Sequence, residues 1–180
     1  MVLTGLFAGL LAVSSQIALP LGPVPHTLQT FFVMLAGFLL GSRWGFASVA
    51  VWIILGLFGL PVFAQGKAGI AVLAGPTGGF LLGFLLCAFL VGWLTERNEA
   101  GLVKTGVVMV GGLLVIYIVG LIGFMLNFEY FLHKPMSLEK AVTLSVIPFF
   151  PFDVVKTLMA AYIGRRAKSA LKRAGYTVNR

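Results

Sequence analysis

Apolar runs of helix length alternate with short polar connections along the whole chain. A helix needs roughly 20 mostly apolar residues to cross a bilayer, and the pattern offers six candidate elements. They cover residues 2–20, 27–40, 46–60, 78–94 and 105–126, and a sixth that is broken by Pro148 and Pro151 before it runs into a basic tail. We therefore expect an all-α integral membrane protein with six transmembrane helices, forming a single membrane domain over residues 1–180.

The connections between these runs differ in character. GSRWG, residues 41–45, is predicted to turn the chain, and the amphipathic, aromatic residues 127–140 to lie at the membrane interface. Residues 59–80, GLPVFAQGKAGIAVLAGPTGGF, are rich in glycine and polar side chains although apolar runs flank them. Irregular backbone at membrane depth is tolerated only where it lines a cavity or is buried in protein. This segment is therefore predicted to form a lid or wall over an external pocket.

The composition indicates that a bilayer is the solvent of this chain. Of its 180 residues, 59% are hydrophobic and 10% are charged, whereas a soluble domain averages about 25% charged residues. The net charge of +8 does not indicate a nucleic-acid partner, because the basic residues cluster at the ends of the apolar runs. The N-terminus lacks the basic stretch of a signal peptide, so we interpret it as the first helix. A single cysteine, Cys87, excludes an intramolecular disulfide.

The distribution of Lys and Arg predicts how the chain is oriented in the cell membrane. Nine of these residues lie on one side of the six-helix layout and three on the other. The positive-inside rule places the richer side, with both termini, in the cytoplasm, so the pocket faces outside. The richer side holds Arg43, Arg97, Lys104, Arg165, Arg166, Lys168, Lys172, Arg173 and Arg180, and the other side holds Lys67, Lys134 and Lys140.

Asp153 is the only one of the five acidic residues that lies inside a predicted membrane helix. A charge at the bilayer centre costs roughly 2.5–3.5 kcal/mol on insertion scales, so such a residue is a functional candidate. Lys156 follows three residues later and shares its helix face. The pair comes after Pro151, which suits a helix N-terminus whose free N–H groups favour a polar ligand. The alternative is an internal ion pair that satisfies itself.

The sequence lacks the catalytic residues that several classes of enzyme require. His26 and His133 are isolated in loops, so no cluster has the spacing of a metal site. The chain has no P-loop motif for ATP hydrolysis and no serine beside a base. A binding site remains as the prediction. Its candidate polar groups are Gln16, His26, Gln29, Gln65, Lys67, Thr77, Asp153 and Lys156, and its candidate aromatic walls are Phe31, Phe63, Phe80, Phe149 and Phe152.

Three blocks in order, VPHTLQTFFVMLAGFLLGSRWG, GLFGLPVFAQGKAGIAVLAGPTGGFLLGF and PFFPFDVVK, resemble the BioY family over nearly all of the chain. Those proteins are the biotin-binding S components of energy-coupling factor (ECF) transporters. The resemblance implies a six-helix membrane protein that binds biotin with high affinity from outside. It also implies a transmembrane coupling subunit and two ABC-type ATPases as partners, so that ATP is used only on partner subunits and the chain itself has no cofactor.

The resemblance also assigns roles to individual residues. Asp153 and Lys156 map onto the biotin site, and the GPTGG loop, Gly75–Gly79, lies over the ligand. The first-helix motif of small residues, here Ala8 and Ala12, is implied to dock on the coupling subunit; packing within the chain is the alternative reading. The full set of ligand-binding candidates is Asp153, Lys156, Gly75, Thr77, Gly78, Gly79, Phe80, Gln65, Lys67 and Gln29.

The chemistry of biotin suits these candidates. Asp153 can accept from the two ureido N–H groups and Lys156 can donate to the carbonyl, while Lys67 or the GPTGG amides can meet the carboxylate. Which end of biotin Lys156 contacts stays open. The sequence departs from the family pattern at Gln65, where a second glycine is common, and at Phe80, where tyrosine is common. The alternatives are a stand-alone biotin facilitator or oligomer without ATPases, an intramembrane enzyme and a structural scaffold.

Overall fold

The computed structural model describes residues 1–19, 23–96 and 101–174 as a bundle of helices. The predicted end of the first helix at Pro20 and the charges of Arg97, Glu99 and Arg180 lie outside these residues. The elements in chain order are α1 Val2–Gln16, β1 Ala18–Leu19, β2 His26–Thr27, α2 Gln29–Leu57, η1 Ala64–Gly66, η2 Ile70–Val72, α3 Gly78–Glu96, α4 Leu102–Leu126, the π-helical turn η3 Asn127–Phe131, α5 Leu138–Ser145 and α6 Phe150–Arg173.

The element α2 is a helical hairpin. Gly41 interrupts it with a φ of 82°, in the left-handed region where glycine meets no steric penalty. A Cβ built on Gly45 would lie 2.8 Å from the Cα of Gly37, whereas residues eight apart in a straight helix are separated by about 12 Å. The chain therefore reverses at Gly41, which confirms the predicted turn and divides α2 into an arm before it and an arm after it.

A carboxylate from α3 holds this reversal in place. Both oxygens of Glu96 are used: one accepts from the backbone N–H of Ser42 at 3.0 Å and the other from the Ser42 hydroxyl at 2.7 Å. Ser42 begins the second arm of α2, so the carboxylate sits where a helix N-terminus favours negative charge.

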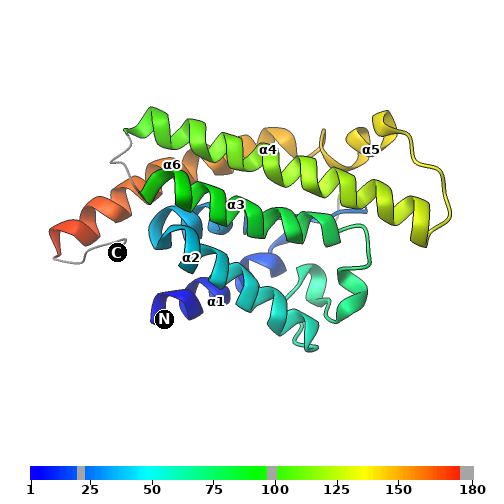
Figure 1. The fold of residues 1–180 in the computed structure, drawn as a ribbon, viewed down its shortest axis with the longest axis horizontal. Coiled ribbons are helices and arrows are strands. Elements are labelled where there is room, and N and C mark those ends of the chain that lie inside the picture. The colour runs from blue at the N-terminus through cyan, green and yellow to red at the C-terminus, as the bar shows by residue number, and fades with distance from the viewer. Residues whose placement is uncertain (20–22, 97–100, 175–180) are drawn as a thin grey trace.

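The long helices α3, α4 and α6 run along the long axis of the molecule (Figure 1). By length and hydropathy, α3, the continuous helix Leu102–Phe131 and α2 taken as one element each suffice to cross a membrane, and α5 with α6, bent by 55°, makes a fourth candidate. Counting α2 as two arms and adding the shorter apolar α1, the described residues contain six membrane helices. The fold prediction is confirmed, although the fifth helix continues for a turn beyond its predicted end at Leu126.

Helix α3 lies between α2 and α4 and packs closely against both. A Cβ on Gly79 would lie 2.8 Å from the Cα of Gly123 in α4. Small residues allow such close approach of helices in lipid, where hydrophobic burial adds little to association. Helix α6 packs against α2 and α4, and one face of its first turns, with Asp153 and Lys156, is buried.

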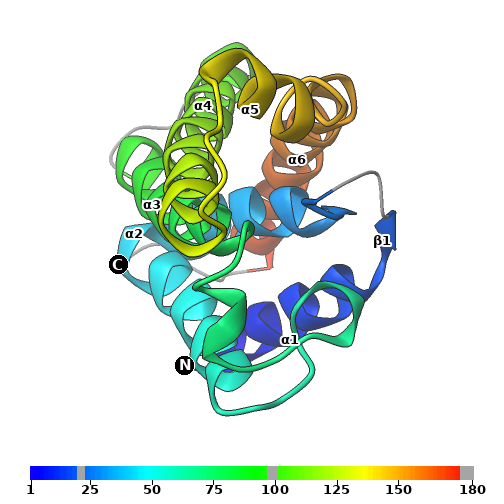
Figure 2. The same cartoon turned by 90° about the vertical axis from the view of Figure 1, so that its right-hand side faces the viewer.

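The loop between α2 and α3 covers the end of the bundle opposite to Met1 and the C-terminal end of α6 (Figures 1 and 2). Side chains from three helix ends satisfy the polar backbone of this loop, as the prediction for irregular backbone requires. The bonds are Ser15 Oγ to Val62 O at 2.7 Å, Trp52 Nε1 to Val62 O at 2.8 Å, Gln16 Nε2 to Phe63 O at 3.1 Å, Gly66 N to Gln16 Oε1 at 3.1 Å, and Asn127 Nδ2 to Ala74 O.

Candidate ligand-binding site

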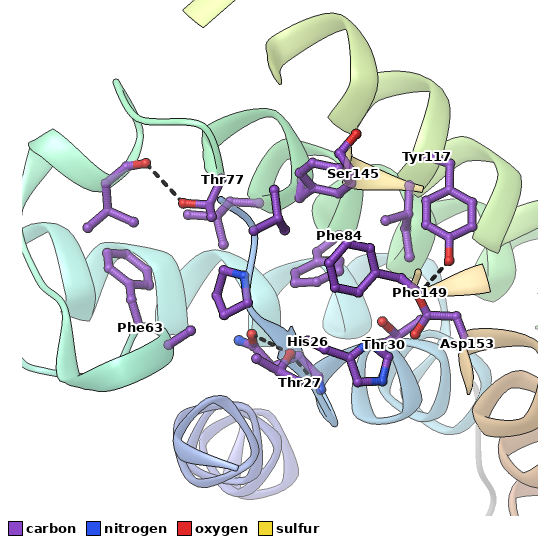
Figure 3. Close-up of a pocket in the computed structure, with 18 of the residues that line it drawn as sticks. His26, Thr27, Thr30, Phe63, Thr77, Phe84, Tyr117, Ser145, Phe149 and Asp153 are labelled. Carbon is purple, nitrogen blue, oxygen red and sulfur yellow. Dashed lines mark hydrogen bonds between the residues drawn. The ribbon is translucent and has the colours of Figure 1, made fainter. Parts of the chain in front are cut away.

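A cavity opens beneath this loop, among α2, α3, α4 and α6 (Figure 3). It holds about 710 Å³ of space between protein atoms, part of it continuous with solvent. The lining residues are Val24, Pro25, His26, Thr27, Gln29, Thr30, Trp52, Phe63, Ala64, Lys67, Val72, Thr77, Phe80, Leu81, Phe84, Ile116, Tyr117, Ser145, Phe149, Asp153 and Lys156.

A buried ion pair lies in the wall of this cavity. Lys156 Nζ is 2.5 Å from Asp153 Oδ1, and both residues are less than 10% exposed. Tyr117 of α4 donates its hydroxyl to Asp153 Oδ2 at 2.6 Å, visible in Figure 3. Lys156 also donates to the backbone carbonyl of Thr27 at 2.7 Å. Three segments far apart in the sequence thus hold one buried pair of charges.

The start of α6 explains why these charges lie here. Pro151 is the second residue of the helix and needs no intrahelical partner for its nitrogen. Asp153 lies in the first turn, where the helix dipole favours a negative charge, and its N–H donates to Phe149 O at 2.9 Å. The broken helix therefore carries a charged first turn into the bundle at the level of the cavity.

The pair retains hydrogen-bonding capacity for a ligand. A carboxylate offers about four acceptor positions and an ammonium group three donors. Tyr117 and Lys156 occupy two positions on Asp153, while Asp153 and the Thr27 carbonyl occupy two donors of Lys156. Asp153 can accept further N–H groups, and Lys156 can donate once more, to a carbonyl.

Gln29 contributes a buried donor that faces this cavity. The residue is 4% exposed, and its Oε1 accepts from the Thr27 hydroxyl at 2.9 Å. Its Nε2 has no hydrogen-bond partner within the described part of the chain. A buried donor left unpaired costs about 1–3 kcal/mol, so an acceptor on a bound ligand would satisfy a group that the protein leaves open.

His26 forms part of an aromatic wall over the ion pair. Its ring stacks on Phe149 with centroids 5.4 Å apart and meets the edge of Phe152 at 5.3 Å. Burial lowers the pKa of His26, and the positive charge of Lys156 lowers it further, while Asp153 opposes this change. His26 is therefore neutral at pH 7 and presents an imidazole rather than a cation to the cavity.

The sequence profile of the BioY family matches residues 1–173. The chain belongs to the BioY family. Two relatives cover most of it: the biotin transporter BioY of Thermotoga maritima, 45% identical over 91% of this chain and 92% of the relative, and the probable biotin transporter BioY of Pyrococcus horikoshii, 40% identical over 91% and 93%. The fold is similar to a crystal structure at 2.1 Å of the S-component for biotin from an ECF-type ABC transporter, with a TM-score of 0.84 and 26% identity over 93% of this chain and 89% of the other.

In this BioY family member, the structure brings together six of the ten ligand-binding candidates. They lie on α2, on the loop before α3, at the start of α3 and on α6, and all line the cavity. These six are Gln29, Lys67, Thr77, Phe80, Asp153 and Lys156. Their role in binding stays a prediction. The aromatic candidates divide in the same way, since Phe63 and Phe149 line the cavity with Phe80, whereas Phe31 and Phe152 do not.

The other four ligand-binding candidates lie outside the cavity wall. Gln65 is exposed on the loop, with a φ of 62° that places it in the left-handed region. The amides of Gly75 and Gly78 already donate to carbonyls of the loop, at 3.3 and 3.0 Å. Gly79 allows α3 to approach α4. Two of the GPTGG amides are thus used within the loop, whereas Thr77 of the same segment lines the cavity, and a role of this segment in binding stays a prediction.

Ala8 and Ala12 are also placed differently from the expectation of an outward docking face. Ala8 is 3% exposed and belongs to the hydrophobic core, and Ala12 packs against that core. The open small residues of α1 are Gly5 and Gly9, where an added Cβ would meet no atom within 4 Å. The spacing of four residues identified a common face correctly, but spacing does not indicate which face turns inward.

Sequence reasoning missed Tyr117, Thr27 and Trp52 as parts of this site. Tyr117 could have been predicted, because it is a hydroxyl-bearing residue within a long apolar run. A buried tyrosine usually finds a hydrogen-bond partner. Thr27 contributes its backbone carbonyl to Lys156, for which no sequence signal exists. His26, which the sequence placed in a loop and among the candidate polar groups of the site, lines the cavity and stacks on Phe149.

Proposed function

We propose that this chain is the biotin-binding, substrate-specific membrane subunit of an ECF-type vitamin uptake transporter, capturing biotin from outside with high affinity. The observation that carries the proposal is the buried Asp153–Lys156 pair, held by Tyr117 and facing a cavity with aromatic walls. Its relatives are named as biotin transporters rather than enzymes.

The two ends of biotin suit different depths of the cavity. A ligand carboxylate beside Asp153 would place two negative charges together, whereas the ureido group offers Asp153 two N–H donors and Lys156 a carbonyl. We place the ureido group at this pair and the apolar bicyclic ring among Phe63, Phe80 and Phe149. The carboxylate then lies towards Lys67, an exposed residue of the cavity wall, where the charge keeps part of its water.

The cavity end faces outside in this proposal, and both termini are cytoplasmic in a multi-pass protein of the cell membrane. Seven described Lys and Arg residues lie at the end that carries Met1, in agreement with the positive-inside rule. Single cysteines introduced as Lys67→Cys and Lys168→Cys, in a Cys87→Ala background, should react with an impermeant reagent from opposite sides. Equal labelling of both from outside would overturn this orientation.

The expected partners are a transmembrane coupling subunit and two ABC-type ATPases, which would supply ATP hydrolysis. The inward position of Ala8 changes what its substitution should do. Ala8→Trp should overpack the core, at a typical cost of about 1–3 kcal/mol, and lower biotin binding. Gly9→Trp projects outward and should leave binding intact; loss of co-purification with the coupling subunit would then identify this side of α1 as the docking face.

Equilibrium binding of radiolabelled biotin to the purified chain tests the function itself. We expect one saturable site from which unlabelled biotin displaces the label. Absence of saturable binding by a folded, monodisperse preparation would overturn the proposal. Uptake of biotin by cells that lack ECF partners would instead favour the stand-alone facilitator, and it would leave the binding assignment in place.

A further inference from the structure

A groove runs between α4 and α6 towards the end of the bundle that carries Met1, and it shares no lining residue with the cavity beneath the loop. Its membrane part is lined almost entirely by apolar or small residues, among them Gly106, Val107, Val110 and Leu158. Its outer part is basic and contains Arg165, Arg166 and Arg173. Leu102 and Tyr162 line both parts, so the apolar groove and the basic recess are continuous.

The dimensions match one lipid leaflet. Leu158 and Arg166 are eight residues apart on α6, which corresponds to about 12 Å along the helix axis. Half of the hydrocarbon core of a bilayer is roughly 15 Å. An acyl chain lying along Leu158 and Val107 would therefore end in a headgroup at the level of Arg166.

The positive charge of the recess favours an anionic lipid headgroup. No acidic residue is among the described residues that line either part of the groove. Arg166 lies over the ring of Tyr162, with its guanidinium carbon 5.1 Å from the ring centroid, which holds this cation at the junction of the two parts. Basic pockets between membrane helices are suited to anionic lipid headgroups.

We propose that the groove between α4 and α6 binds an anionic phospholipid, with its phosphate at Arg166 and Arg173 and one acyl chain along Gly106 and Leu158. The positive-inside rule and the helix dipole account for basic residues at the end of α6. They do not account for a recess that continues into an apolar groove. The proposal requires only that the chain spans a membrane, and it is independent of the ligand of the other cavity.

Two substitutions test the two parts of the groove, each with a matched control. Arg166→Gln removes a charge from the recess, and Arg43→Gln removes one from an exposed turn at the same end. Gly106→Leu fills the apolar part, where an added Cβ meets no atom within 4 Å. Gly111→Leu places the same side chain in open space on the same helix but outside the groove.

The full chain is reconstituted in nanodiscs of equal parts phosphatidylglycerol and phosphatidylcholine, and the lipids that remain bound after release are counted by native mass spectrometry. We expect wild type to retain phosphatidylglycerol preferentially. Arg166→Gln should lower that preference about fivefold, as expected for one basic contact at a membrane surface, and Gly106→Leu should lower it by filling the space of the acyl chain. Both controls should match wild type, and all variants should keep the wild-type unfolding temperature.

An equal loss in Arg43→Gln would show diffuse attraction by the whole basic end and would overturn the site. Unchanged retention in Arg166→Gln and Gly106→Leu would overturn it as well. If the groove variants instead lose only co-purification with a coupling subunit, the groove is a protein-docking face and the lipid assignment is wrong.

Discussion

The two ends of α6 carry charge in different ways. In its first two turns, Asp153 and Lys156 are buried, and both bond to side chains or backbone of other elements. In its last turns, Arg166, Lys172 and Arg173 are exposed at the end of the bundle. A charge inside the bundle persists only where the protein replaces its water with partners, whereas a charge at the membrane surface keeps water and lipid phosphate beside it. The first arrangement suits selective binding of a small molecule, and the second suits orientation in a membrane.

The largest difference in stability should appear when one basic side chain is removed from each end of α6. Lys156→Met leaves the buried Asp153 without its counter-ion, which typically costs about 3–5 kcal/mol. Arg173→Met at the exposed end should change stability by about 0.5 kcal/mol or less. Thermal unfolding of both purified variants measures the contrast, and similar unfolding temperatures would show that the buried pair does not need its partner. The double variant Asp153→Asn/Lys156→Met separates the penalty of the unpaired carboxylate from a direct ligand contact.

Tyr117 lies beside the buried pair and Tyr162 beside the exposed charges, so removing the hydroxyl from each allows a second comparison. Tyr117→Phe deletes the hydroxyl that donates to Asp153. The lost bond leaves a buried charged acceptor short of a donor, at about 1–3 kcal/mol, and biotin affinity should fall by tenfold or more. Tyr162→Phe keeps its ring under Arg166 and should bind biotin as wild type does. Calorimetric titration measures both, and an unchanged affinity in Tyr117→Phe would separate this hydroxyl from the site.

The dependence of folding stability on pH should also arise at the cavity end, from His26. The pKa of His26 is lowered in the folded protein by burial and by Lys156, so the unfolded chain takes up a proton more readily than the folded one. Stability is then complete above the ordinary pKa of about 6.5 and falls as pH drops from there towards the lowered value. His26→Leu should remove this slope, whereas Arg166→Gln should retain it, since arginine stays charged throughout. Unfolding temperatures between pH 5 and 8 test this, and an unchanged slope in His26→Leu would contradict it.

The smallest expected effect concerns the loop over the cavity. Gln65 has a positive φ that residues other than glycine rarely adopt. Gln65→Gly should therefore raise stability by about 1 kcal/mol or less, and Gln65→Ala, which keeps the strain, should not. Biotin affinity should be the same in both, because Gln65 does not line the cavity. A clear loss of affinity in either variant would return Gln65 to the set of ligand contacts.

The sequence predicted the fold well because lipid imposes a simple rule on it. Long apolar runs must be helices, and the turn at Gly41 and the break before α6 follow from glycine and proline. The Asp153–Lys156 pair was predictable for the same reason, since charge inside an apolar run is conspicuous.

The finer placement of side chains was not predictable in this way. The inward turn of Ala8 depends on how α1 rotates against its neighbours, and the Thr27 carbonyl has no side-chain signal at all. The sequence of the GPTGG segment likewise does not show that Gly78 packs against Leu73 of the loop or that Gly79 lets α3 approach α4. Spacing reveals which residues share a face, whereas the packing partner of that face emerges only in three dimensions.

The claim that ligand binding belongs to the buried pair is tested most directly by one measurement on three proteins. The dissociation constant for radiolabelled biotin is determined by equilibrium binding to wild type, Asp153→Asn and Arg166→Gln. The account predicts that Asp153→Asn, which keeps the shape but not the charge, binds at least tenfold more weakly, a difference of about 1.4 kcal/mol, and that Arg166→Gln binds as wild type does. Wild-type affinity in a folded Asp153→Asn protein, or an equal loss in both variants, would contradict it.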